Sequence, residues 1–347
     1  MKILVSALEH SANIHLKSLL KELGDDVDIV GIFNKDLGEP IVDLSALAIM
    51  GFVDALKKLR FFFKLKDEMV ELAKDADKVL LIDSSGFNLP LAKALKKHYP
   101  NKEIIYYILP QAWAWKKKRI PVLAKTIDTL ASILPFEPSY YPKYAPISYV
   151  GHPLLDQIKE FKTSLNDEIK NIVFMPGSRK GEITKLMPIY RQLRAKLNVK
   201  GIIIIPTNFS QEDITQLYGN LDGFEIRHET YKTLLEADFA FICSGTATLE
   251  ASIIGTPFVL SYIANKIDYF IGSRLVKLSY VGLANIMWEK HCGKTIHPEY
   301  IQNDVTLENL LEAYHNYDRT SFLEDSRGLR AYLQNGSSKN VARLIKE

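Results

Sequence analysis

The chain has 347 residues, of which 47% are hydrophobic, and a formal net charge of +3. This length accommodates two domains of ordinary size, and the apolar content excludes an intrinsically disordered chain. The nearly balanced charge gives no electrostatic signature of a nucleic-acid-binding protein. The two cysteines, Cys243 and Cys292, do not make a disulfide framework and favour a reducing compartment.

The N-terminal apolar run at residues 3–8 is too short for the core of a signal peptide. No window approaches the roughly 20 apolar residues that span a bilayer. We therefore expect a protein of the cytoplasm, either free or peripheral on a membrane.

Short apolar runs alternate with helix-periodic stretches along the whole chain. In the first half, strands are expected at residues 3–7, 27–33, 78–83, 103–109 and 129–134, and helices at residues 14–23 and 89–98. In the second half, strands are expected at residues 171–175, 201–206, 237–243 and 256–261, with a helix-rich end from residue 307. This alternation predicts an α/β fold with parallel sheets that carry helices on both faces.

The strand–helix rhythm restarts across residues 149–170, a segment that contains Gly151, Pro153 and a polar stretch. We place the domain boundary there, which gives an N-terminal domain of residues 1–160 and a C-terminal domain of residues 161–347. The last helices are candidates for packing back on the N-terminal domain. Ligands of such sheets bind at the carboxyl ends of the strands, so site residues are expected there.

The most informative segment is residues 237–250, which read as a buried strand, a small-residue turn and a helix start. Such a turn aims free backbone N–H groups at solvent, and these groups bind phosphate. A carboxylate follows that could accept hydrogen bonds from sugar hydroxyls. An ordinary turn between strand and helix is the competing interpretation. The candidate residues for a nucleotide diphosphate are Ser244, Gly245, Thr246, Ala247, Thr248 and Glu250.

A second phosphate-type loop follows the strand expected at residues 171–175. Gly177 permits an unusual backbone conformation, and Ser178 and Arg179 supply donors and positive charge. An arginine can clamp a phosphate with two parallel hydrogen bonds. The alternative is a basic surface turn, which two such loops in one domain make less favourable.

Polar residues also follow two strands of the first half. Glu9 and His10 come after the first strand, and Asp83 ends the third. Each is a candidate acid or base. Neighbouring residues have a competing structural explanation, because Ser11, Asn13, Ser84, Ser85 and Asn88 all suit the N-cap of a following helix.

Three further features have a functional and a structural interpretation. Trp113 and Trp115 precede four cations and suit either sugar stacking or an ordinary amphipathic helix. His152 lies near the domain boundary, where a substrate role competes with a structural one.

Residues 48–66 combine cations with a wide apolar surface, which suits either an anionic membrane surface or a buried helix with a solvated rim. The membrane candidates in that stretch are Phe52, Leu56, Lys57, Arg60, Phe61, Phe62 and Phe63.

The sequence contains no metal-ligand constellation, no D-x-D acidic pair, no GxxxxGK[ST] loop and no G-x-G-x-x-G after the first strand. These absences argue against an ATPase and against a nicotinamide-dependent enzyme. No metal and no other cofactor is expected.

The motifs in their order resemble those of the lipid-A-disaccharide synthases, bacterial glycosyltransferases with the GT-B fold. SGTATLE alone is shared loosely with other glycosyltransferases, but the whole set is specific and covers nearly the full chain. It comprises LEHSAN (8–13), IDSSGFN (82–88), PQAWAWKKKR (110–119), LPFE (134–137), YVGHPLLD (149–156), MPGSRKGEI (175–183), SGTATLE (244–250), VGLANIM (281–287) and PEYIQ (298–302).

The resemblance implies two Rossmann-like domains that face each other across a cleft. It also implies transfer of 2,3-diacylglucosamine from UDP-2,3-diacylglucosamine to 2,3-diacylglucosamine 1-phosphate, at the cytoplasmic face of the inner membrane. UDP is expected on the C-terminal domain and the acceptor on the N-terminal one. By match to the family's motifs, Asn285, Glu299 and Gln302 join the two loops as nucleotide-facing positions.

Two N-terminal motifs depart from the family pattern. Leu8 and Ala12 stand where the family often has glycine, and Asn13 stands in place of an acid. Gly86 replaces the second acid of the other motif, so a base role cannot be transferred to that position. Asp83, Glu9 and His10 remain as candidates for the base. Another GT-B enzyme that uses a UDP-sugar, or a catalytically silent UDP-sugar-binding protein, stays open as an alternative.

Overall fold

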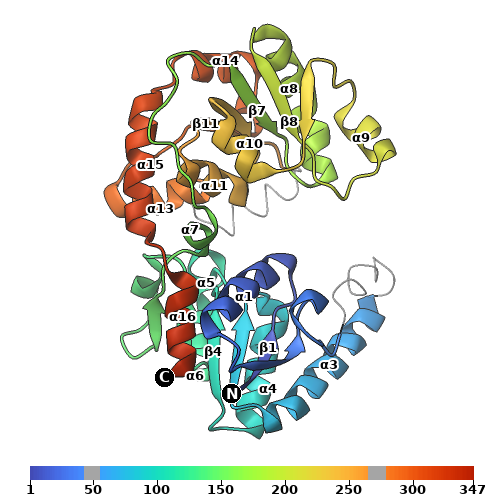
Figure 1. Ribbon diagram of the computed structural model, residues 1–347, viewed down its shortest axis with the longest axis vertical. Coiled ribbons are helices and arrows are strands. Elements are labelled where there is room, and N and C mark those ends of the chain that lie inside the picture. Colours follow the sequence, from blue (N-terminus) through green and yellow to red (C-terminus); the bar gives the residue numbers. More distant parts are fainter. Residues whose placement is uncertain (43–54, 265–278) are drawn as a thin grey trace. The chain divides into compact units, whose positions relative to one another are not determined.

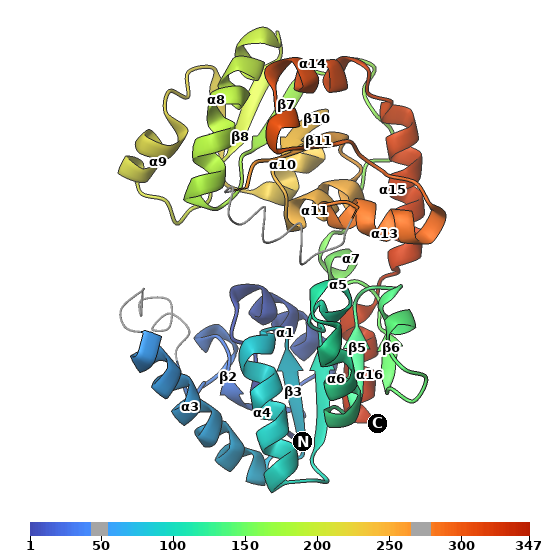
Figure 2. The ribbon, with the colours of Figure 1, turned by 180° about the vertical axis from the view of Figure 1, so that it is seen from behind.

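The computed structural model describes residues 1–42, 55–264 and 279–347, with the side chains of the helix that begins at Ala55 described from residue 60 onward. Figure 1 and Figure 2 show two units, each a parallel sheet with helices on both faces. Unit 1 comprises Met1–Asp156 and Gln334–Glu347, and unit 2 comprises Gln157–Leu333.

Unit 1 contains a six-stranded sheet in the order β2-β1-β3-β4-β5-β6, and every pairing is parallel. The strands are β1 (Lys2–Ser6), β2 (Asp28–Ile32), β3 (Lys78–Ile82), β4 (Glu103–Tyr107), β5 (Thr129–Ser132) and β6 (Ile147–Tyr149). The longer helices are α1 (His10–Leu23), α3 (Ala55–Leu72), α4 (Ser85–His98), α6 (Ile120–Thr126) and α16 (Ser337–Lys346), with short α5 (Ala112–Trp115) and α7 (Pro153–Gln157).

Both faces of this sheet are covered by helices. Successive side chains of a strand point to opposite faces, so neighbouring residues of one strand join different hydrophobic cores. In β3, Val79 and Leu81 join the core under α3, α4 and α6. Leu80 and Ile82 join the opposite core under α1 and α16. The chain's last helix, α16, therefore completes the core of the N-terminal unit, and Figure 1 shows it in red beside α1.

Unit 2 contains a second six-stranded parallel sheet in the order β12-β11-β10-β7-β8-β9. The strands are β7 (Asn171–Met175), β8 (Lys200–Ile204), β9 (Phe224–Arg227), β10 (Phe239–Ile242), β11 (Phe258–Tyr262) and β12 (Glu299–Ile301). The helices are α8 (Lys180–Lys196), α9 (Gln211–Tyr218), α10 (Thr230–Glu236), α11 (Thr246–Ile254), α13 (Leu283–Cys292), α14 (Leu307–His315) and α15 (Arg319–Leu333). Helices α8, α9 and α14 share one core with the strands, and that core includes the aromatic residues Phe174, Tyr190, Phe239 and Phe241.

The predicted parallel α/β architecture is confirmed, and all nine expected strands are present with ends shifted by up to two residues. Three strands were not predicted: β6, β9 and β12. Each lies at an edge of its sheet and is three or four residues long, with no fully buried residue. Within the described ranges, no helix is both long and apolar enough to cross a membrane.

Of the five residues offered as N-caps after β1 and β3, only Ser84 occupies an N-cap position. Helix α1 begins at His10, so Ser11 and Asn13 are inside it, and the Asn13 amide donates to the carbonyl oxygens of Ala7 and Glu9 (both 2.8 Å). Helix α4 begins at Ser85, and Ser84 occupies its N-cap without a capping hydrogen bond from its side chain.

Candidate active site

The two phosphate-type loops of unit 2 lie side by side, because β7 and β10 are neighbours in the sheet. Ile242 pairs with Met175, the last residue of β7, and the Cys243 N–H donates to the Met175 carbonyl (2.8 Å). From β7 the chain proceeds through α8 to β8 on one side, whereas β10 lies on the other. This is the topological switch point, where open parallel sheets bind ligands.

A pocket of about 260 Å³ opens at this point. One part of its lining is polar and comes from the two loops, and the other part is apolar and comes from strand ends. The lining residues are Met175, Gly177, Ser178, Ile204, Pro206, Thr230, Ile242, Cys243, Ser244, Gly245, Thr246, Ala247 and Glu250.

Glycines shape both loops. Gly177 has φ 103° and Gly245 has φ 128°, a conformation that L side chains rarely adopt. Gly245 is the N-cap of α11, so the unpaired amides of that helix begin at the pocket. A helix start of this kind attracts anions through its N–H groups and its dipole. The pocket therefore has the chemistry of a phosphate site on its polar side.

Five of the predicted nucleotide residues do not line this pocket: Arg179, Thr248, Asn285, Glu299 and Gln302. Thr248 is buried, and its hydroxyl donates to the Gly245 carbonyl (2.8 Å). The Thr248 side chain thus stabilises the turn, and its role in binding a nucleotide stays a prediction. The Arg179 guanidinium forms an ion pair with Glu182 (2.9 Å).

Glu250 is the carboxylate of the pocket. It is partly buried, and burial raises its pKa to about 7. No described residue donates a hydrogen bond to it, so its oxygens are available to hydroxyl groups of a ligand.

Asn285 and Glu299 form a hydrogen bond with each other and further hydrogen bonds with the backbone of nearby residues. The buried Asn285 amide donates to Glu299 Oε1 (2.8 Å) and to the His297 carbonyl (2.9 Å), and its oxygen accepts from the backbone N–H groups of Ile296 and His297. The backbone N–H groups of Val281 and Gly282 donate to the Glu299 carboxylate. The polar atoms of the Asn285 side chain are thus used in internal hydrogen bonds, and its contact with a nucleotide stays a prediction. Gln302, which follows β12 with φ 57°, is partly buried, and its role stays a prediction.

Several lining residues were missed from the sequence. Met175, Ile204, Pro206, Ile242 and Cys243 lie at strand ends that were themselves predicted, so their position at the carboxyl edge was the available signal. Thr230 gave no such signal, because it follows the unpredicted edge strand β9.

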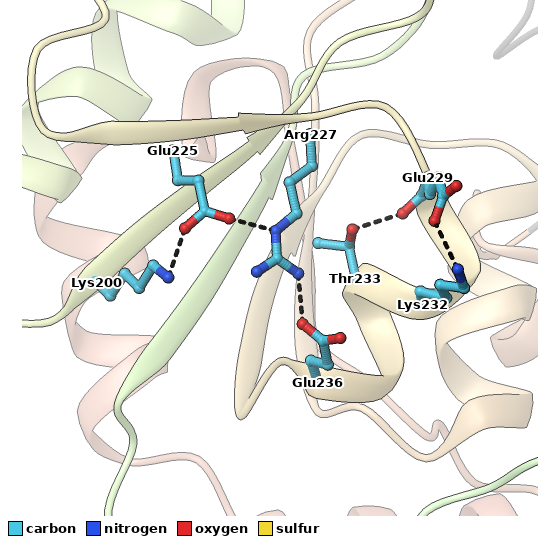
Figure 3. Close-up of polar contacts among 7 residues, drawn as sticks. All are labelled: Lys200, Glu225, Arg227, Glu229, Lys232, Thr233 and Glu236. Carbon is cyan, nitrogen blue, oxygen red and sulfur yellow. Dashed lines mark hydrogen bonds and ion pairs between the residues drawn. The ribbon is translucent and has the colours of Figure 1, made fainter.

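Thr230 is the first residue of α10, and Figure 3 shows the ion pair through which Arg227 of the sheet binds Glu236 of this helix. Arg227 on β9 binds Glu225 and, on α10, Glu236 (both 2.5 Å). Lys200 on β8 binds Glu225 from the other side (2.5 Å). Such pairs near the surface each contribute little stability, typically below about 1 kcal/mol, and the pair of Arg227 with Glu236 is the one that joins the sheet to α10, whose first residue lines the pocket.

Unit 1 has its own switch point between β1 and β3, and the predicted carboxylates meet there. The Ser84 hydroxyl donates to Glu9 Oε1 (3.1 Å), which joins the loop after β3 to the loop after β1. Asp83 and Ser84 have φ 51° and φ 45°, left-handed values that are uncommon for residues other than glycine. Such strain is typical of functional loops.

Hydrogen bonds from behind fix this strained backbone. The Asp83 carbonyl accepts from the Tyr106 hydroxyl (2.6 Å) and from the Asn88 amide (2.8 Å). Asn88 is in turn held by the Ser6 hydroxyl (2.6 Å). Burial, followed by the charge of Glu9, raises the pKa of Asp83, against a smaller opposing effect of the Ser84 backbone N–H. A carboxylate with a raised pKa is a stronger base than an ordinary one.

The other candidates of unit 1 are distributed between surface and interior. Trp115 is 48% exposed with the Lys116 ammonium 3.9 Å from its ring centre, whereas Trp113 is buried against Phe136. His10 is exposed at the start of α1. His152 is buried, and burial, followed by the charge of His15, lowers its pKa to about 3. A neutral, buried His152 favours the structural interpretation of this residue.

The basic aromatic stretch is only partly described. Phe52 and the side chains of Leu56 and Lys57 lie outside the described residues. Arg60 is exposed, and Phe63 is 55% exposed with Lys66 5.2 Å from its ring centre. Phe61 and Phe62 pack partly against the core, and Phe62 contacts Phe87 (5.9 Å between ring centres). The three phenylalanines therefore divide between core and surface.

A family model described as lipid-A-disaccharide synthetase matches residues 3–340 of this chain. The lipid-A-disaccharide synthase of Helicobacter pylori is 47% identical over 353 residues, which cover 98% of this chain and 96% of that protein. The Campylobacter jejuni enzyme of the same name is 44% identical over 364 residues, which cover 99% of each chain. This chain belongs to the lipid-A-disaccharide synthase family.

Solved structures place this family member among the GT-B proteins. Acinetobacter baumannii MurG superposes with a TM-score of 0.62 at 14% identity, over 99% of both chains. The UDP-GlcNAc 2-epimerase of Neisseria meningitidis, bound to UDP-GlcNAc, gives a TM-score of 0.63 at 12% identity over the whole of both chains. At such identities the likeness establishes the fold, and the expected GT-B architecture is confirmed.

Proposed function

We propose that this chain is a lipid-A-disaccharide synthase. It transfers 2,3-diacylglucosamine from UDP-2,3-diacylglucosamine to the 6-hydroxyl of 2,3-diacylglucosamine 1-phosphate, giving the β-1,6-linked disaccharide 1-phosphate and UDP. The observation that carries the proposal is the glycine-shaped pocket at the switch point of unit 2, in a chain that matches the family over its full length.

The polar part of that pocket suits UDP. The amides at the start of α11 and the loop of Gly177 and Ser178, which line the pocket, are the groups to which we assign the diphosphate. Glu250 is the group for the ribose hydroxyls. In the transition state the leaving diphosphate gains negative charge, which fixed N–H groups and the nearby Arg179 stabilise.

The carboxylates of unit 1 supply the base. Asp83, or alternatively Glu9, removes the proton of the acceptor hydroxyl while its oxygen attacks the anomeric carbon from the side opposite UDP. The bond from the anomeric carbon to the diphosphate oxygen breaks in the same step, so the configuration inverts. The raised pKa of Asp83 makes it the better of the two.

The acyl chains of both substrates imply access to a lipid surface. The exposed Phe63 beside Lys66 and the exposed Arg60 have the composition that favours the anionic surface of the inner membrane. Trp115 and its neighbouring cations are a second surface of this kind on the same unit.

The direct test is an assay of the purified protein with UDP-2,3-diacylglucosamine and 2,3-diacylglucosamine 1-phosphate. We expect release of UDP together with a tetraacyl disaccharide 1-phosphate detected by mass spectrometry. UDP release without the disaccharide would indicate another UDP-sugar enzyme. UDP binding without turnover would indicate a silent binding protein.

A further inference from the structure

The phosphate-type loop of unit 2 contains a carboxylate that the proposed function does not use. Glu182 Oε1 forms an ion pair with Arg179 Nη1 at 2.9 Å, between the N-cap and the first turn of α8. The two partners differ in environment, because the Arg179 side chain is 79% exposed and that of Glu182 only 12%. The Glu182 carboxylate is therefore a mostly buried part of the loop, and the Arg179 guanidinium binds it from the solvent side.

The second oxygen of Glu182 lies behind the pocket wall. A Cβ atom added at Gly177 would be 2.5 Å from Glu182 Oε2 and 3.3 Å from Cys243 Sγ. Gly177 and Cys243 both line the pocket, so the carboxylate is separated from it by little more than a backbone segment. Glycine at position 177 makes this close approach possible.

A negative charge at this place opposes the binding of an anion in the pocket. Charges in a partly desolvated protein site interact more strongly than in water. The Arg179 guanidinium is the only cation with a hydrogen bond to Glu182 among the residues that the structure describes. Without it, the carboxylate would repel a diphosphate at close range.

We propose that Glu182 is a positioning residue that holds Arg179 beside the pocket, and that Arg179 acts as much by neutralising Glu182 as by contacting the diphosphate. Loss of Arg179 therefore weakens nucleotide binding by more than the loss of a phosphate contact alone, because it also leaves the charge of Glu182 without a partner. This inference rests on the proposed function in taking UDP as the ligand.

The test is a double-mutant comparison of UDP affinity by isothermal titration calorimetry. Arg179→Ala is expected to weaken UDP binding about 10- to 100-fold, the range of a lost charge-assisted hydrogen bond. Adding Glu182→Gln to that variant removes the uncompensated charge with little change of shape. We expect it to restore UDP affinity by about 5- to 10-fold relative to Arg179→Ala, as for a close charge pair.

A matched control comes from the adjacent ion pair. Asp213 binds Lys180 at 2.5 Å, and Asp213→Asn makes the same change in net charge without touching Arg179 or Gly177. In the Arg179→Ala background, Asp213→Asn should leave UDP affinity unchanged within about twofold, because the exposed pair is screened by solvent. Thermal unfolding of each variant confirms that the folded fraction is the same.

The inference is overturned if Arg179→Ala/Glu182→Gln binds UDP no better than Arg179→Ala, or if Asp213→Asn restores affinity equally. A merely structural Glu182 would give further loss in the double variant and not recovery. Wild-type protein that fails to bind UDP would overturn this inference too, whereas UDP binding without sugar transfer would overturn only the proposed function.

Discussion

The two sheets have the same topology around their switch points but use different residues there. At β7 and β10 of unit 2, glycines at 177 and 245 take the left-handed backbone conformation and leave room for a pocket. At β1 and β3 of unit 1, Asp83 and Ser84 take left-handed conformations and retain their side chains. The first arrangement presents backbone N–H groups to a ligand, and the second presents a carboxylate. Equivalent turns of one fold thus differ in the residues that they carry, and these are the two turns to which we assign the nucleotide and the base in the proposed function.

The two turns are also stabilised differently. The strained turn of unit 1 is held by Tyr106 and Asn88, which both donate to the Asp83 carbonyl. The turn of unit 2 is held mainly by its own helix, through the Thr248 hydroxyl. A base must be fixed in direction, whereas a phosphate site needs mainly access to amides.

The largest expected effect comes from removing the carboxylate of unit 1. Asp83→Asn keeps the shape of the side chain, and asparagine tolerates the left-handed conformation that Asp83 has. We expect kcat to fall about 10²- to 10⁴-fold, the usual contribution of a general base, with UDP affinity unchanged. Steady-state kinetics with calorimetric UDP titration measure both quantities. Glu9→Gln is the matched control, and an equal loss of kcat there with none in Asp83→Asn would transfer the base role to Glu9.

A smaller effect is expected from the glycines of unit 2. Gly177→Ala adds a methyl group to a position with φ 103° and only 2.5 Å from Glu182, so we expect UDP affinity to fall about tenfold or more and stability to fall by about 1–3 kcal/mol. Gly245→Ala meets no atom within 4 Å, and only its backbone strain of about 1–2 kcal/mol should appear.

Chemical denaturation and UDP titration separate the two glycines. Gly181→Ala, inside α8 with open space around it, is the stability control and should be neutral or stabilising by about 0.5–1 kcal/mol. Equal UDP affinity in wild type and Gly177→Ala would remove this loop from the nucleotide site.

The stability of the protein and its UDP affinity should both depend on pH through the carboxyl group of Glu250. Burial raises its pKa to about 7 from the unfolded value of 4.5, so the folded state binds the extra proton between these values. The contribution of Glu250 to stability therefore falls as pH rises from about 4.5 to 7 and is constant above. The proposed function has Glu250 accept hydrogen bonds from the ribose hydroxyls in its charged form, so UDP affinity should rise through pH 7.

Glu250→Gln should remove both dependences. The melting temperature of the variant relative to wild type should increase from pH 5 to pH 7 and then stay level. A UDP affinity with the same pH profile in wild type and variant would contradict the assignment.

The smallest effects concern the surface of α3. Phe63→Ser changes a mostly exposed side chain, so stability should stay within about 0.5 kcal/mol, while sedimentation with phosphatidylglycerol vesicles should decrease a few-fold. Phe62→Ser changes a ring packed on the core and should cost about 1–3 kcal/mol. Unchanged vesicle binding of Phe63→Ser would show that this surface does not meet lipid.

The sequence predicted the interior of both sheets and failed at their edges. Strands β3 and β10 are continuous apolar runs because both faces are covered, and such runs are visible without the structure. Strands β6, β9 and β12 are half-exposed and only three or four residues long, so their pairing depends on the neighbouring strand and not on their own composition.

In the candidate site, too, features that are local in the sequence could be predicted, and features that depend on distant residues could not. The glycine turns were predictable because strand, glycine and helix start are consecutive in the sequence. The internal use of Asn285 was not, because its partners at residues 296–299 are defined only by the fold. The link between Glu9 and Ser84 likewise joins residues 75 positions apart, which no local pattern reveals.

The packing of α16 on α1 has a consequence for the order in which the protein is made. The core under α1 includes Val341, Ala342 and Ile345, so a nascent chain that has emerged through Asp156 lacks part of its hydrophobic core. At about 5–20 residues per second, translation of Gln157–Leu333 takes on the order of ten to thirty-five seconds. Until residues 334–347 have been synthesised, α1 therefore exposes an apolar face that α16 later covers, and transiently exposed hydrophobic surface of this kind makes a partly folded chain prone to aggregation.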